Sequence, residues 1–124
     1  MPWTFSFYAT AGGRQPGRDY LRAIEPEGRE RVTDDLEYLG KHGPNSDHVD
    51  CKHLDGKLWE LRVKARRSHR VFYVTISGQH IVYLHAITKK TQKTPKPELD
   101  LANRVLKKGY RGEPDARYSV PLHG

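Results

Sequence analysis

The sequence predicts an α+β fold in which helices pack on a small antiparallel β-sheet. An alternating strand pattern stands near the start, two helical periodicities follow it, and three closely spaced strand-like runs come next. A last helical periodicity, from about Pro95 or Pro97 to Lys108, completes a β-α-α-β-β-β-α order. A chain of 124 residues fits one domain of this kind. We expect the domain to span residues 1–108 and an irregular tail to span residues 109–124.

The first predicted strand covers residues 3–9, where aromatic side chains alternate with hydroxyl-bearing ones. A short helix over residues 16–24 begins with a proline, which suits a first helical turn. A second helix runs from Pro26 to Gly40, because apolar residues recur at i, i+4 and i+7 and a glycine stands at the end. We expect the two helices to form a hairpin and residues 43–56 to form a loop.

Three strand-like runs occupy residues 57–63, 69–76 and 80–87. Each alternates apolar and polar side chains over part of its length, as strands with two different faces do. The connections between the runs are too short for parallel crossovers, so neighbouring runs must be antiparallel. We therefore predict a three-stranded meander in the second half of the domain.

The basic residues of the chain are concentrated in one segment. The net charge is +7. Residues 57–93 carry nine Lys or Arg and a single acid, Glu60, whereas residues 1–56 carry seven Lys or Arg against ten acids. Clustered cations of this kind are typical of nucleic-acid-binding proteins.

The cysteine content and hydropathy predict a cytoplasmic protein with no membrane contact. Cys51 is the single cysteine, so an internal disulfide is impossible and a reducing compartment is expected. The chain has no secretory signal pattern and no apolar run of about 18 residues. His48, Cys51 and His53 lie close in sequence but lack a fourth ligand at a usual spacing. We therefore expect no metal and no other cofactor.

Four segments, "LDGKLWELRV", "HRVFYV", "IVYLHAITKKTQKTP" and "ELDLANRVL", together resemble the phage-derived Gp49-like, HigB-type branch of the RelE/ParE toxin superfamily. The resemblance covers residues 3–108 and implies a RelE-like fold. It also implies the toxin of a type II toxin–antitoxin system, a ribosome-dependent, metal-free endoribonuclease that cuts messenger RNA. The implied partners are a HigA-like helix-turn-helix antitoxin, messenger RNA on the ribosome, and operator DNA only through the antitoxin.

The resemblance implies site residues as well. Arg70 matches the family's arginine in the second meander strand, and Arg62 matches its basic residue at the end of the first. Lys89 and Lys90 match the basic residues that follow the last strand. Better-known RelE toxins have a lysine near the position of Glu60, where the Gp49-like branch commonly has a glutamate. The superfamily also contains ParE-type toxins directed at DNA gyrase, so the fold alone does not determine the target.

Metal-free RNA cleavage needs a base near the 2′-hydroxyl and cations around the pentacoordinate phosphorus. Arg62 and Arg70 suit the second role, because a guanidinium binds phosphate oxygens through two parallel hydrogen bonds. Glu60 shares a strand face with Arg62, so it is either a base or one half of an exposed ion pair of small energetic weight. His85 is either a proton-transfer group or a structural histidine. His69 has a weaker claim, because alternation places it opposite Arg70.

The predicted site falls into two groups of residues. The predicted catalytic residues are Glu60, Arg62, Arg70, His85 and Lys90. The predicted RNA-binding residues are Lys57, Lys64, Arg66, Arg67, Lys89 and Lys93. The lysines after the last strand either contact phosphate or form a solvated loop. Two other functions stay open, a ParE-type gyrase-directed toxin and a non-catalytic nucleic-acid-binding protein of phage origin.

Overall fold

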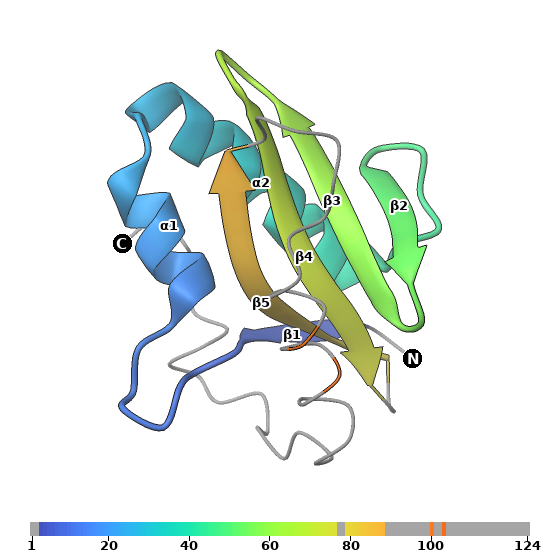
Figure 1. The fold of residues 1–124 in the computed structure, drawn as a ribbon. Helices are drawn as coiled ribbons and strands as arrows, with labels where there is room; N and C mark the ends of the chain where they lie inside the picture. Colours follow the sequence, from blue (N-terminus) through green and yellow to red (C-terminus); the bar gives the residue numbers. More distant parts are fainter. Residues whose placement is uncertain (1–2, 77–78, 89–99, 101–102, 104–124) are drawn as a thin grey trace.

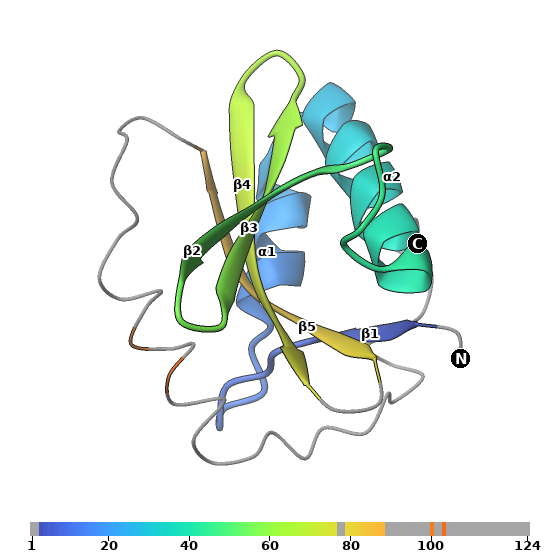
Figure 2. The same ribbon diagram turned by 90° about the vertical axis from the view of Figure 1, so that its right-hand side faces the viewer.

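The computed structural model describes residues 3–76, 79–88, 100 and 103, and within them a five-stranded sheet carries two helices (Figure 1). The elements are β1 (Thr4–Phe7), α1 (Pro16–Ala23), α2 (Pro26–His42), β2 (Asp50–Asp55), β3 (Leu58–Lys64), β4 (Ser68–Ile76) and β5 (His80–Thr88). The strand order is β1-β5-β4-β3-β2. Figure 2 shows the sheet from its side, with both helices on the same face. The predicted α+β class is confirmed.

The predicted meander is confirmed, because β3, β4 and β5 are consecutive antiparallel neighbours. Strand β1 joins the other side of β5 in parallel, so the sheet is mixed. The expected loop over residues 43–56 is wrong, because Asp50–Asp55 forms the edge strand β2 against β3. That strand is largely exposed and polar on both faces, so its sequence lacks the apolar alternation of a buried strand.

The main core lies between the helices and the sheet. Val32, Leu36 and Leu39 of α2 are all buried there, which confirms the apolar periodicity of that helix. The Tyr83 hydroxyl of β5 donates a hydrogen bond of 2.7 Å to the Leu36 carbonyl, so its one polar group is satisfied in the core. Burying one Val or Leu side chain contributes about 1.5–3 kcal/mol. The sheet face that packs against the helices therefore anchors α2.

Helix α1 is held beside β5 by a partly buried polar network. The Tyr20 hydroxyl lies 2.6 Å from His69 Nδ1 of β4 and 2.8 Å from Thr88 Oγ1 of β5. Burial lowers the pKa of His69 more strongly than the Glu25 carboxylate, 3.7 Å from Nε2, raises it. His69 thus lies fully buried on the helix-covered face, away from Arg70, as its strand alternation predicted.

The end of α1 is capped from α2. The Arg29 guanidinium donates hydrogen bonds to the carbonyls of Leu21, Arg22 and Ile24, which are groups that a helix end leaves without intrahelical partners. This arrangement sets the angle at which the chain turns from α1 into α2.

Strand β1 is held to β5 by His80. Its Nδ1 lies 2.7 Å from the Thr4 hydroxyl and its Nε2 lies 2.8 Å from the Ser6 hydroxyl. Burial lowers the pKa of His80, so the neutral ring is favoured and one nitrogen donates while the other accepts.

The predicted last helix lies outside the described residues except for Asp100 and Asn103, which are both helical. The predicted tail, residues 109–124, also lies outside them. In the part of the chain that the structure describes, no helix has the length and apolar character needed to cross a membrane.

Candidate functional site

The candidate site lies on the face of the sheet opposite the one on which α1 and α2 pack. Strand alternation places Glu60 and Arg62 of β3 on this face, because Leu61 between them belongs to the helix-side core. The register then places Arg70 of β4 directly opposite Arg62. Two arginines from neighbouring strands therefore flank one carboxylate.

The ion-pair geometry centres on a single carboxylate oxygen. Arg70 Nε lies 3.1 Å from Glu60 Oε1, and Arg62 Nε lies 3.6 Å from the same atom. The Glu60 side chain is 2% exposed, whereas those of Arg70 and Arg62 are 14% and 32% exposed. The carboxylate thus lies at the buried bottom of the cluster, and the guanidinium groups lie on its solvent side.

The interpretation of Glu60 as half of an exposed ion pair is wrong, because its side chain is almost fully buried. A buried carboxylate is costly unless cations compensate it, and here two do. With two guanidinium groups and one carboxylate the cluster keeps one net positive charge. It can therefore hold both arginines in place and still attract an anion such as a phosphodiester.

His85 lies in the same row of cross-strand paired residues as Glu60. Glu60 faces Phe72 across β3–β4, and Phe72 faces His85 across β4–β5, so two strand spacings separate Glu60 from His85 by about 10 Å. The ladder has a bulge between Phe72 and Tyr73, which re-aims the residues of β5 opposite it. His85 also lines an open pocket of ≈ 410 Å³ with Arg14, Pro16, Asp19 and Tyr20 of the α1 region. These four pocket residues are not among the site residues predicted from the sequence.

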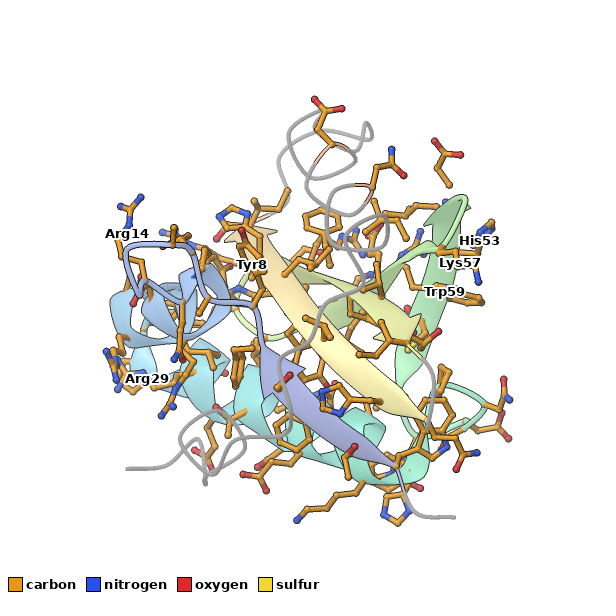
Figure 3. All side chains as sticks on the ribbon, turned by 90° about the horizontal axis from the view of Figure 1, so that it is seen from below. Tyr8, Arg14, Arg29, His53, Lys57 and Trp59 are labelled. Atoms are coloured by element: carbon orange, nitrogen blue, oxygen red, sulfur yellow. The ribbon has the colours of Figure 1, made fainter. Side chains whose placement is uncertain are left out.

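The predicted RNA-binding residues do not all lie together. Lys64, Arg66 and Arg67 are exposed at the turn between β3 and β4, near the arginine pair. Lys57 stands before the other end of β3, about 23 Å from Lys64 along an extended strand. Figure 3 shows Lys57 beside His53 and Trp59, on the side of the molecule away from Arg14. Lys89, Lys90 and Lys93 lie outside the described residues.

Two of the three residues considered for a metal have other contacts. The His48 ring stacks on Tyr38 with ring centroids 4.0 Å apart, and His53 Nε2 donates to the Gly56 carbonyl at 2.6 Å. Among the described residues, no group of three or more His, Cys, Asp or Glu side chains is placed to hold a metal ion.

Comparison with known proteins gives one family. Residues 19–107 match the model of the family described as "Phage derived protein Gp49-like (DUF891)". The match covers α1 from Asp19 onward, all of α2, strands β2 to β5, and all the residues of the ion-pair cluster. No curated protein matches the chain.

Proposed function

Because the chain belongs to the Gp49-like family of phage-derived proteins, we propose that it is the toxin of a type II toxin–antitoxin pair that cuts messenger RNA on the ribosome. A toxin-like role fits this family. The observation that carries the proposal is the pair of arginines, Arg62 and Arg70, gathered over the buried Glu60 carboxylate. Such a cluster offers a phosphodiester two guanidinium groups that are already oriented.

In the proposed reaction, Arg62 and Arg70 bind the oxygens of the scissile phosphate. The 2′-hydroxyl loses its proton to His85 and attacks the neighbouring phosphorus, and the bond to the 5′-oxygen breaks as that oxygen takes up a proton from water. The products are a 2′,3′-cyclic phosphate and a 5′-hydroxyl. Pre-placed donors of this kind stabilise the charged transition state, and removing one costs about 10²–10³-fold in rate.

Glu60 has a positioning role in this proposal. Its carboxylate is buried beneath both guanidinium groups, so it contacts them and leaves the phosphate to them. A fixed guanidinium needs no reorganisation when charge develops on the phosphorane, and this makes its stabilisation larger than that of a mobile side chain. The general base is then His85, which borders an open pocket.

The proposed partner is a HigA-like helix-turn-helix antitoxin that neutralises the toxin by covering the arginine pair. The chain's net charge of +7 supports a partner with an acidic contact surface. In this scheme the toxin reaches operator DNA only through the antitoxin. The proposed site of action is the cytoplasm, where translated messages are found.

The proposal is tested by inducing wild type, Arg70→Ala and Arg31→Ala in cells and mapping messenger RNA ends. Arg31 is an exposed α2 residue, which makes it a control of equal charge change. We expect wild type and Arg31→Ala to stop growth and create new ends within codons, and Arg70→Ala to do neither. Growth arrest with intact messages would contradict the nuclease and point to a gyrase-type target, and undiminished cutting by Arg70→Ala would contradict the role of the arginine pair.

A further inference from the structure

Three arginines that the proposed mechanism does not use lie along α1. The three are spaced four residues apart: Arg18 and Arg22 lie on one side of the helix, about 6 Å apart in rise, and Arg14 lies in the turn before it. Together they line an open pocket of ≈ 400 Å³ with Gly13, Gln15 and Asp19. Three cations against one carboxylate make this pocket strongly positive.

This pocket continues toward the candidate site. Arg14 and Asp19 also line the second pocket, which extends over Pro16 and Tyr20 to His85. The two pockets together form the α1 groove, which we define by Arg14, Arg18, Asp19, Arg22 and His85. His85 pairs with Phe72, which in turn pairs with Glu60, so the α1 groove ends two strand spacings, about 10 Å, from the ion-pair cluster.

The middle arginine of the row is held in place by packing. The Arg18 guanidinium lies over the Phe7 ring, 5.8 Å from its centroid, and α1 approaches that ring closely because Gly17 has no side chain. Burial, and secondarily the charge of Arg22, lowers the pKa of Arg18. Arg14 and Arg22 are exposed on either side of it. The row therefore presents neighbouring like charges, which an evenly charged polyanion would compensate.

We propose that the α1 groove binds the sugar–phosphate backbone of single-stranded RNA next to the scissile phosphate. The groove holds the strand, and the sheet face with Arg62, Arg70 and His85 cuts it. A regular row of cations matches one phosphate per nucleotide, and the groove leads to a titratable side chain at the proposed reaction centre. The identity of the ligand rests on the proposed function, but binding in the groove requires no cleavage.

The test measures binding of a 2′-O-methyl RNA oligonucleotide, which lacks the attacking hydroxyl, by fluorescence anisotropy between 50 and 200 mM salt. The variant is Arg14→Gln/Arg18→Gln/Arg22→Gln. The matched control, Arg31→Gln/Lys41→Gln/Lys52→Gln, removes the same charge from exposed positions elsewhere. Losing three phosphate contacts makes the negative slope of log affinity against log salt shallower by about 2. The ratio of wild-type affinity to variant affinity therefore falls about 16-fold between 50 and 200 mM salt. The control is expected to keep the wild-type slope.

Because Arg18 packs on Phe7, thermal unfolding followed by circular dichroism accompanies each measurement. If the triple variant unfolds, the double variant Arg14→Gln/Arg22→Gln replaces it, with an expected slope change of about 1.4. A wild-type slope in the folded α1 variant, or an equal loss in the control, overturns the proposal. RNA affinity that survives while binding of the antitoxin is lost also overturns it, because the groove would then be a protein-docking surface. If wild type binds RNA as expected but never cuts messages, RNA binding in the α1 groove is supported and the nuclease function is refuted.

Discussion

Replacing Glu60 with Gln removes the negative charge from beneath two arginines while keeping the shape of the side chain. Breaking a buried ion pair in this way costs about 3–5 kcal/mol when the remaining charge is sealed from water. Here Arg70 and Arg62 are 14% and 32% exposed, so both can regain some hydration. We therefore expect the free energy of unfolding to fall by about 2 kcal/mol, which is below that range because solvent screens the exposed part of both guanidinium groups.

Urea unfolding at neutral pH measures this change, with Glu30→Gln on the exposed side of α2 as the control. The control's free energy of unfolding is expected to stay within about 0.5 kcal/mol of the wild-type value. In both variants the slope of the free energy of unfolding against urea concentration is expected to equal that of wild type. A Glu60→Gln protein as stable as wild type would refute the reasoning, because the arginines would then not depend on the carboxylate.

The same substitution separates positioning from base catalysis. If Glu60 acts through the arginines, Glu60→Gln slows RNA cleavage, but it adds little once Arg70→Ala is present, because both changes remove one interaction. If Glu60 were the base, the two losses would multiply. Single-turnover cleavage by the two single variants and the double variant gives the answer, and multiplicative losses would contradict the positioning role.

Three further predictions concern the fold around the site. Tyr20→Phe is expected to lower the free energy of unfolding by about 1–2 kcal/mol, because it leaves buried hydrogen-bonding groups without their hydroxyl partner; urea unfolding measures this, and an unchanged midpoint would contradict it. Gly40→Ala is expected to destabilise by about 1–3 kcal/mol despite the better helix propensity of Ala, because the new Cβ would collide with the Phe5 ring; a raised melting temperature would show that the ring can move. Burial lowers the pKa values of His69 and His80 below the unfolded value of 6.5, so stability is full above that value and is lost as pH falls below it toward the folded pKa values. Unfolding measured at pH 7.5 and 5.5 is expected to show a smaller loss in His80→Gln than in wild type, and an equal loss would contradict the assignment.

The sequence predicted the elements that have strong periodicity. Helix α2 shows its buried side through Val32, Leu36 and Leu39, and the meander follows from alternation and short connections. Strand β2 could not be predicted in this way, because an exposed edge strand is stabilised by backbone pairing with β3 and needs no apolar pattern.

The candidate site was predictable in composition and less so in geometry. Alternation alone places Glu60 and Arg62 on one face. The position of Arg70 depends on the β3–β4 register, which pairs it with Arg62. The burial of Glu60 is likewise not revealed by a strand considered alone. The α1 arginines are visible in sequence as a four-residue repeat, but the acidic balance of residues 1–56 conceals them when charge is counted by segment.

The chemistry of the RNA ends tests the central claim most directly. Messenger RNA from cells that express wild type or Arg70→Ala can be sequenced after ligation steps that select 5′-hydroxyl or 5′-phosphate ends. Attack by the 2′-hydroxyl at a phosphate held by Arg62 and Arg70 predicts new 5′-hydroxyl ends, paired with 2′,3′-cyclic phosphates, in wild type and not in Arg70→Ala. New ends that carry 5′-phosphates, or no new ends at all, would contradict the account.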